Sequence, residues 1–258
     1  MKVALITGAS SGIGLELAHV MAKEKHNLVL VARSIDKLNS LAEELIATHG
    51  IKVKTYKADL SNASEIENLY KQTKEDDIEV SYLINNAGFG EYGDFSENDW
   101  DKLNTMMQLN MVSLVHLTKL YSKDMVSSSF GKIMNVASTA AFQPLPYFAV
   151  YAATKSFVLS FSEAIASELK DHGITVTALC PGLTDTGFVE AANMEDTKFL
   201  DKAKAGMATS EEVAEYGYEA MMKGKTVAVH GMINSIMVNS SRFLPRDLVT
   251  TIAKKVQE

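Results

Sequence analysis

Short apolar runs alternate with longer amphipathic stretches along most of the chain. The apolar runs are rich in β-branched residues and predict strands over residues 3–7, 28–32, 53–57, 82–85, 132–137, 175–179 and 227–230. The stretches between them repeat apolar residues at helical spacing and predict helices near residues 13–25, 36–48, 63–75, 99–125, 152–172 and 211–223. Apolar strands that alternate with helices are typical of a parallel sheet covered on both faces. We therefore expect a doubly wound α/β fold with right-handed crossovers.

The ends of several predicted helices carry recognisable signals. Gly50 and Gly173 each follow a helical stretch and precede a strand, as left-handed C-cap residues do. Thr209 and Glu212 have the spacing of a capping box, and Gly224 ends the same helix. These signals support the alternation of helices and strands.

The composition gives no reason to divide the chain. It has four prolines among 258 residues, and no stretch rich in Pro, Gly or Ser resembles a linker. We therefore expect one domain over residues 1–258. Residues 183–208 form the least regular part of the chain and are long for a connection in a compact domain, so we expect them to act as a lid over the substrate.

Charge and cysteine content exclude several classes of partner and compartment. The net charge is −7 and the basic residues are scattered, so nucleic acid and anionic membranes are not expected partners. Cys180 is the only cysteine, so an intrachain disulfide is impossible, and the six histidines lack metal-ligand spacing. The apolar run at residues 3–6 is too short for a signal peptide or a membrane span. We expect a cytoplasmic protein without a metal.

The first strand runs through a glycine-rich loop into a helix. The loop reads Thr7-Gly8-Ala9-Ser10-Ser11-Gly12-Ile13-Gly14. Glycines let a backbone approach a pyrophosphate closely, and the N-terminus of the helix supplies free N–H groups and positive potential. Glycine is also favoured in any tight turn from strand to helix, and the spacing differs from the common Gly-x-Gly-x-x-Gly fingerprint. The loop nevertheless predicts a dinucleotide-binding site.

The end of the second predicted strand indicates which nicotinamide cofactor fits. An NAD site places a carboxylate there to hold the ribose 2′-hydroxyl. This strand ends in Ala32-Arg33-Ser34, and Arg33 can pair with a 2′-phosphate. Asp36 lies further on, where it suits the first turn of the following helix. We therefore expect NADP(H), with NAD(H) less favoured.

A possible acid–base group follows in the second half of the chain. Tyr151 and Lys155 lie four residues apart in a helical pattern, so their side chains share one face. An ammonium near a phenol stabilises the phenolate and lowers its pKa, which makes tyrosine usable in proton transfer. Ser138 follows a predicted strand, and its hydroxyl can donate to an oxygen that becomes negative during reduction.

These residues together resemble the short-chain dehydrogenase/reductase family over nearly the whole chain. Thr7–Gly14 resembles the family's Thr-Gly-x-x-x-Gly-x-Gly loop, Asp59-Leu60 its adenine-pocket acid, and Asn85-Asn86-Ala87-Gly88 its cofactor-supporting strand end. The positions that match the catalytic tetrad are Asn110, Ser138, Tyr151 and Lys155, and those that match the nicotinamide-side loop are Pro181, Gly182, Thr184 and Thr186. The resemblance implies one Rossmann-like domain with a seven-stranded parallel sheet.

The resemblance also implies a role for each residue. Tyr151 would protonate the substrate oxygen while hydride reaches the carbon, and Ser138 would fix the carbonyl. Lys155 would hold the nicotinamide ribose and lower the pKa of Tyr151, and Asn110 would help to hold a water that links Lys155 to solvent. The expected cofactor-binding residues are Gly8, Ser10, Ser11, Gly12, Ile13, Gly14, Arg33, Ser34, Asp59, Leu60, Asn86, Ala87, Gly88, Tyr151, Lys155, Pro181, Gly182, Thr184 and Thr186.

The substrate is less clearly encoded than the cofactor. Apolar residues beside the motifs would line a cleft for a small hydrophobic carbonyl or alcohol, namely Phe89, Phe142, Leu145, Phe148 and Phe188. Residues 242–258 are amphipathic and could cover the substrate or form a subunit contact. Cys180 is expected to be a buried small residue and not a nucleophile, and Trp100 and Tyr121 are expected to be packing residues.

Other functions and assemblies stay open at this level. A non-catalytic NADP-binding regulator could use the same fold, and so could a dehydratase or an epimerase. The helices near residues 99–125 and 152–172 carry more apolar surface than one sheet face needs, with Phe157, Phe161, Ile165 and Leu169 at spacing four in the second. We therefore expect a homodimer or a homotetramer.

Overall fold

Seven parallel strands form the central sheet of the computed structural model, which describes residues 2–192 and 207–257. The strands are β1 (Val3–Thr7), β2 (Asn27–Ala32), β3 (Val53–Lys57), β4 (Val80–Asn85), β5 (Gly131–Val136), β6 (Ile174–Cys180) and β9 (Val227–Val229). Their order across the sheet is β3-β2-β1-β4-β5-β6-β9, so the direction of winding reverses between β1 and β4. Ligands of such sheets bind at this reversal, beyond the carboxyl ends of the strands.

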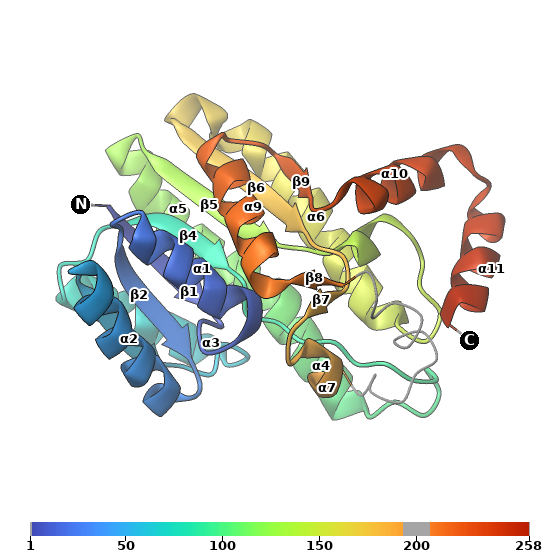
Figure 1. Cartoon of the computed structure of the whole chain (residues 1–258), viewed down its shortest axis with the longest axis horizontal. Helices are drawn as coiled ribbons and strands as arrows, with labels where there is room; N and C mark the ends of the chain where they lie inside the picture. Colours follow the sequence, from blue (N-terminus) through green and yellow to red (C-terminus); the bar gives the residue numbers. More distant parts are fainter. Residues whose placement is uncertain (1, 193–206, 258) are drawn as a thin grey trace.

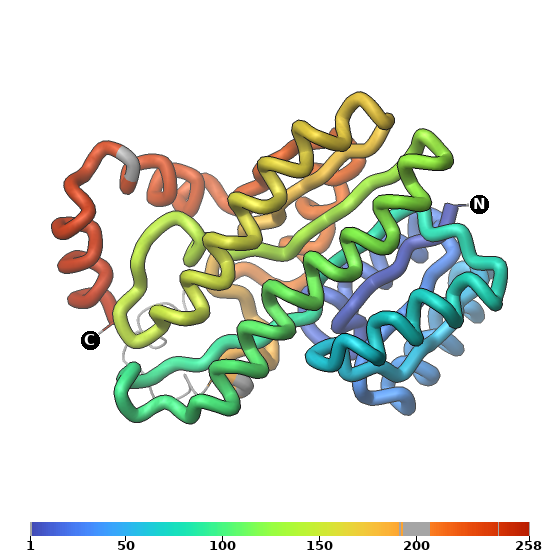
Figure 2. The backbone as a smooth tube through the Cα atoms, turned by 180° about the vertical axis from the view of Figure 1, so that it is seen from behind, coloured from blue at the N-terminus to red at the C-terminus, as the bar shows by residue number. Residues whose placement is uncertain are grey.

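Helices cover both faces of the sheet (Figures 1 and 2). One layer contains α1 (Gly12–Lys23), α2 (Ile35–His49) and α9 (Ser210–Met222); the other contains α3 (Ala63–Glu75), α5 (Leu114–Ser128) and α6 (Ala149–Leu169). Successive side chains of a strand point to opposite faces of the sheet, so they pack alternately against the two helix layers. In β1, Ala4 and Ile6 pack with the first layer and Leu5 with the second. The fold is therefore the expected doubly wound, Rossmann-like α/β arrangement.

The predicted helix ends agree with the structure. Gly50 and Gly173 are left-handed C-caps with φ of 66° and 74°, and Gly224 has φ of 68°. Thr209 and Glu212 form both hydrogen bonds of a capping box at the start of α9. Five shorter elements lie between these helices and strands: η2 (Thr139–Phe142), η3 (Lys170–His172), β7 (Thr184–Asp185), α7 (Phe188–Ala191) and β8 (Ala208–Thr209).

The helix expected near residues 99–125 is interrupted. The structure has α4 (Trp100–Met107), then a π-helical segment η1 (Gln108–Ser113), and then α5. Wider π turns inside α-helices occur frequently at functional sites, and this one carries Asn110. Tyr121 is buried as expected, but the expectation for Trp100 was wrong because 66% of it is exposed at the start of α4.

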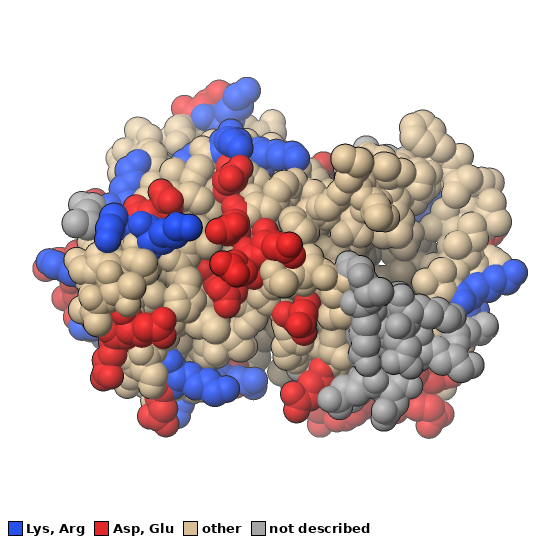
Figure 3. Space-filling model, in the orientation of Figure 1, with Lys and Arg blue, Asp and Glu red and all other residues tan. Residues whose placement is uncertain are grey.

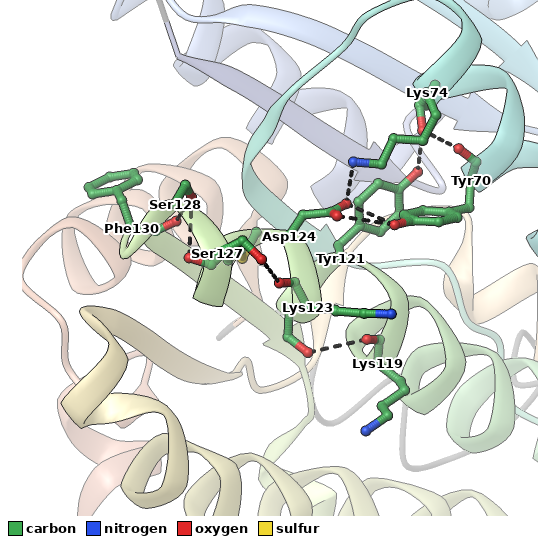
Figure 4. A network of polar contacts seen from close by, with 12 residues as sticks. Tyr70, Lys74, Lys119, Tyr121, Lys123, Asp124, Ser127, Ser128 and Phe130 are labelled. Atoms are coloured by element: carbon green, nitrogen blue, oxygen red, sulfur yellow. Dashed lines mark hydrogen bonds and ion pairs between the residues drawn. The ribbon is translucent and has the colours of Figure 1, made fainter.

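Polar side chains join α3 to α5 in the second layer (Figure 4). The Asp124 carboxylate accepts hydrogen bonds from the Tyr70 hydroxyl at 3.0 and 3.1 Å and forms an ion pair with Lys74 at 2.6 Å. Beside them, the hydroxyls of Thr73 and Tyr121 lie 3.1 Å apart. Because α3 precedes β4 and α5 follows it, these contacts fix two helices over the strand that ends at the site.

The chain ends in an arm that extends away from the sheet (Figures 1 and 2). This C-terminal arm, residues 231–257, contains α10 (Met232–Ser240), η5 (Ser241–Phe243) and α11 (Arg246–Gln257). Helix α10 was not predicted from the sequence. The predicted lid at residues 183–208 is described only at its two ends, which β7 and β8 join as a parallel pair; residues 193–206 lie outside the described residues.

Candidate active site

The glycine loop after β1 forms a tight turn at the winding reversal. Gly8 and Gly12 have φ of 65° and 55°, a region that glycine adopts without a Cβ penalty. A Cβ on Gly14 would collide with the Gly8 carbonyl, so this glycine lets α1 pack against the loop. Ser11, the N-cap of α1, makes no side-chain cap hydrogen bond. The Ser11 side chain thus leaves the first N–H groups of α1 uncapped, as at a helix N-terminus that binds an anion.

The loop is tied to the end of β4 by hydrogen bonds. The Thr7 hydroxyl accepts from the backbone N–H groups of Asn86 and Ala87 at 2.9 and 3.0 Å. The Asn86 amide donates to the carbonyls of Thr7 and Gly8 at 3.0 and 3.3 Å. Residues that are about 80 positions apart in the sequence therefore form one rigid surface.

One cavity of about 1100 Å³ runs from this loop to Tyr151. Most of the residues expected from the sequence line it: Gly8, Ser10, Ser11, Gly12, Ile13, Arg33, Ser34, Asp59, Leu60, Asn86, Ala87, Gly88, Ser138, Tyr151, Lys155, Pro181, Gly182, Thr184 and Thr186. Of the expected residues, Gly14 and Asn110 lie behind the wall. The volume and the lining residues fit a dinucleotide with room for a substrate.

The part of the cavity beside the glycine loop and the end of β2 is the region where a 2′-phosphate would be recognised. Ala32 ends β2 and is nearly buried, whereas Arg33 and Ser34 are exposed at the cavity edge. Asp59 lies opposite, where hydrogen bonds from Ser61 and the charge of Arg33 hold the pKa of its carboxyl below the usual range. Asp36 lies in the first turn of α2, as expected. The end of β2 therefore carries no carboxylate, because Ala32 is its last residue, and the guanidinium of Arg33 follows it.

Tyr151 lies at the opposite end of the cavity and is 7% exposed. The Phe148 ring stacks on it at 4.4 Å, and the Phe188 ring lies 5.3 Å away. Burial raises the pKa of Tyr151 well above its ordinary value, and a side-chain hydrogen bond with Ser138 lowers it only in part. The phenol is therefore protonated at neutral pH and available as a proton donor.

Lys155 lies one helical turn further along α6. Its ammonium donates to the Val136 carbonyl at 2.8 Å and lies 5.7 Å from the Tyr151 ring centroid. Burial lowers the pKa of Lys155 to about 8. Burial is the largest influence on the pKa of Tyr151, and the Val136 carbonyl holds the Lys155 ammonium beside it.

Asn110 supports the cavity wall from behind. It is 1% exposed, and its amide donates to the Phe89 carbonyl at 2.9 Å and to the Thr154 hydroxyl at 3.2 Å. Its carbonyl oxygen accepts from the Phe89 N–H at 3.2 Å. The π turn thus places one side chain between the loop after β4 and helix α6. A Cβ on Gly88 would lie 2.8 Å from the Asn110 oxygen, which explains why glycine is needed there.

Four of the five apolar residues expected at the substrate end line the cavity: Phe89, Leu145, Phe148 and Phe188. The fifth expectation, Phe142, was wrong. Phe142 ends the 3₁₀ turn η2, which directs it into a separate apolar cluster with Leu114 and Val158. Cys180 is fully buried beside that cluster as expected, and burial raises the pKa of its thiol to about 12.

The sequence did not identify the outer wall of the substrate end. The C-terminal arm supplies this wall through Met237, Leu244, Val249, Ile252 and Val256. The sequence left open whether residues 242–258 cover the substrate or form a subunit contact. Part of α11 lines the cavity, which supports the first alternative. The period-four pattern of Leu248, Ile252 and Val256 was the available signal, but it does not specify what the helix covers.

Within residues 2–192 and 207–257, no group of three or more His, Cys, Asp and Glu side chains could hold a metal ion. In the same part of the chain, every helix is too short or too polar to cross a bilayer.

Comparisons with known proteins identify the relatives of this chain. The model of the short chain dehydrogenase family matches residues 2–197. The 17-beta-hydroxysteroid dehydrogenase type 3 of Mus musculus is 34% identical over 206 residues, which is 77% of this chain and 65% of that protein. This chain therefore spans slightly less than two thirds of that relative's length.

Solved structures show the same architecture. A short-chain dehydrogenase from Sphingobium yanoikuyae in complex with NADPH has a TM-score of 0.84 and 29% identity, with 94% of each chain covered. A short-chain dehydrogenase/reductase from Burkholderia phymatum in complex with NAD has a TM-score of 0.84 and 25% identity, covering 94% of this chain and 93% of that one. Since the family model matches most of the chain and the fold carries the matching motifs, the protein belongs to the short-chain dehydrogenase/reductase family.

Proposed function

We propose that this protein is an NADP(H)-dependent oxidoreductase that interconverts a hydrophobic carbonyl compound and its secondary alcohol. The observation that carries the proposal is the convergence of Ser138, Tyr151 and Lys155 at one end of a cavity whose other end is the glycine loop. All four expected tetrad residues are present, which argues against a non-catalytic regulator.

The choice of NADP(H) depends on the end of β2. A carboxylate at Ala32 would repel a 2′-phosphate, whereas the exposed guanidinium of Arg33 at the cavity edge can pair with one. The related structures include complexes with NADPH and with NAD, so the family alone does not decide the cofactor. The residues of this chain favour NADP(H).

The chemistry divides between cofactor and protein. When bound, the reduced nicotinamide supplies a hydride to the carbonyl carbon and leaves as the oxidised form. Tyr151 donates its phenolic proton to the carbonyl oxygen, so that C=O becomes CH–OH, and it later recovers a proton from solvent. Ser138 donates a hydrogen bond to the same oxygen as negative charge develops there. Lys155 would hold the ribose hydroxyls of the bound cofactor, and its charge would stabilise the phenolate that Tyr151 becomes.

The apolar lining supports a hydrophobic substrate. Phe89, Leu145, Phe148 and Phe188 surround the reacting end, and the arm adds aliphatic side chains opposite them. The proposal includes a cytoplasmic setting, because the single cysteine is buried and free, which suits a reducing compartment.

Consumption of NADPH with a panel of hydrophobic ketones and aldehydes tests this proposal. We expect turnover in the parent and a loss of several orders of magnitude in Tyr151→Phe, which removes only the transferable proton. NADPH binding should persist in that variant, as measured by fluorescence titration. Tight NADPH binding without turnover of any carbonyl in the panel would favour a regulator, and near-normal turnover in Tyr151→Phe would remove Tyr151 from the mechanism.

A further inference from the structure

Helix α10 presents its apolar side to solvent. Met232, Ile233 and Ile236 lie on one helical face and are 81%, 82% and 64% exposed. Asn234 and Ser235, which are polar, are less exposed than these three residues. A surface helix of a soluble protein normally has the opposite arrangement, with apolar residues inward and polar residues outward. We call Met232, Ile233 and Ile236 the α10 patch.

The orientation of α10 is fixed by contacts with the body of the protein. Val238, on the opposite side of the helix, is 4% exposed, and the Asn234 side chain packs so closely on Gly182 that a Cβ there would collide with it. The α10 patch therefore points outward because the inner side is anchored. Phe243, just beyond α10, is 87% exposed and extends the apolar character of the arm. Figure 3 shows mostly uncharged surface over α10, whereas the body carries many charged side chains.

The exposed apolar surface continues into the catalytic cavity. Met237, next to the α10 patch, is 42% exposed and also lines the cavity. Leu244 and Ile252 likewise combine partial exposure with a place in the cavity wall. The arm is therefore apolar on the outside and on the side that faces the substrate. An apolar phase in contact with the α10 patch would lie beside the substrate end of the cavity.

The charge of the arm differs from that of the body. The sequence has no acidic residue between Glu219 and Asp247, and residues 230–258 carry a net charge of +2 while the rest of the chain carries −9. Arg246 and Lys255 are exposed on α11. An anionic surface would attract the arm and repel the body, which would orient the molecule with the α10 patch toward that surface.

We propose that the C-terminal arm docks on an anionic lipid surface through the α10 patch. Apolar side chains beside basic residues are the combination that binds a helix in the plane of a bilayer interface. With 9 residues in α10 and 12 in α11, neither helix can span a bilayer, so the arm lies on the surface. Two cationic arms are less suited to pairing with each other, which favours lipid over a second copy of the chain. The sequence analysis predicted no membrane partner because the basic residues are scattered along the chain. That scatter does not reveal that the arm is positively charged and the body negatively charged.

Flotation with lipid vesicles tests the proposal and does not require turnover, so it is independent of the proposed reaction. The full-length protein is mixed with phosphatidylcholine vesicles that contain or lack phosphatidylglycerol. We expect binding to the vesicles with phosphatidylglycerol, weaker binding without it, and weakening by added NaCl. In Ile233→Gln/Ile236→Gln the partition coefficient should fall by about tenfold or more, since two exposed apolar side chains no longer enter the interface.

A matched variant controls for loss of surface hydrophobicity in general. Ile46 and Phe95 are 45% and 68% exposed and lie outside the arm. Ile46→Gln/Phe95→Gln should leave the partition coefficient within about twofold of the parent, because neither residue belongs to the docking face. Circular dichroism melting and light scattering on all three proteins establish that they are folded and give their masses.

Three results would overturn the proposal. The parent could stay unbound with both kinds of vesicle. The control variant could lose binding as strongly as Ile233→Gln/Ile236→Gln does. The parent could also stay unbound while Ile233→Gln/Ile236→Gln changes the oligomeric mass, which would assign the α10 patch to contact between copies of this chain.

Discussion

The ammonium of Lys155 donates to the backbone carbonyl of Val136 at 2.8 Å. Val136 is the last residue of β5, directly before the segment that carries Ser138, so this hydrogen bond ties α6 to the carboxyl end of the sheet. The bond also orients a buried cation toward the site where the nicotinamide ribose would lie. The end of β5 therefore positions Lys155. Burial disfavours the charged ammonium and so lowers the pKa of this side chain.

We predict that carbonyl reduction loses efficiency as the pH rises through about 8. The pKa of Lys155 is lowered to about 8, so its positive charge is present below that pH and is lost above it. The pKa of Tyr151 is raised, so the phenol keeps its proton over this range. The measurement is kcat/KM for NADPH against pH, which reports groups of the free enzyme.

Lys155→Arg is the matched variant for the pH experiment. A guanidinium keeps its charge at every accessible pH, so this variant should be slower than the parent but show no fall near pH 8. A parent profile that stays flat up to about pH 10 would contradict the assignment to Lys155. The same contradiction would follow if Lys155→Arg retained the fall.

The framework of the fold and the cofactor loop was predictable from local patterns. Strand alternation decides which residues of β1 face each helix layer, and this pattern is visible in the sequence as an apolar run. The roles of Gly8 and Gly12 follow from positive φ, which few other residues adopt. Such features depend on nearby residues, so one sequence is enough to predict them.

The features that were missed depend on tertiary contacts. The π turn around Asn110 adds one residue to a helical turn, and apolar periodicity is nearly the same with or without it. Helix α10 exposes its apolar face. Apolar residues at helical spacing normally indicate the buried side of a helix, so the sequence pattern of α10 indicates the wrong side. Phe142 follows the motif residues in sequence, but the turn η2 directs it to another cluster. These outcomes could not be derived from spacing alone.

Exchange of the β2 end should change the cofactor preference. In Ala32→Asp/Arg33→Ile, a carboxylate replaces a neutral residue and the guanidinium is lost, so we expect kcat/KM with NADPH to fall by about tenfold to hundredfold relative to NADH. The control is Lys37→Ile, which removes an exposed basic residue of α2 outside the cavity and should leave the ratio unchanged. A parent that already prefers NADH would contradict the role of Arg33.

The contact between α3 and α5 should contribute measurably to stability. Asp124 accepts from Tyr70 and pairs with Lys74 while its side chain is 30% exposed, so Asp124→Ala should lower the free energy of unfolding by about 1–2 kcal/mol. Lys71 and Glu75 form an i,i+4 pair that is more than 60% exposed, and Lys71→Ala should cost less than about 0.5 kcal/mol. Urea denaturation measures both, and equal losses would argue against a special role for Asp124.

We predict that the protein forms a homodimer through the face that η1 and α6 present to solvent. Val112 and Phe157 are 49% and 44% exposed on these elements, and Phe157 stacks on Phe161 at 6.1 Å. Apolar side chains on neighbouring helices suit a two-fold contact in which each patch meets its own copy.

Light scattering at micromolar concentration measures this assembly. The parent should show at least twice the monomer mass of 28.2 kDa. In Phe157→Glu, each protomer would bring one carboxylate into the two-fold contact, and the two like charges would be buried together. The mass measured for this variant should therefore be that of the monomer, 28.2 kDa. Ile46→Glu introduces the same charge at a residue of α2 that is 45% exposed, and it should leave the mass of the parent unchanged. A parent mass of 28.2 kDa would show that η1 and α6 do not form the contact, and equal dissociation in both variants would point to a general effect of added charge.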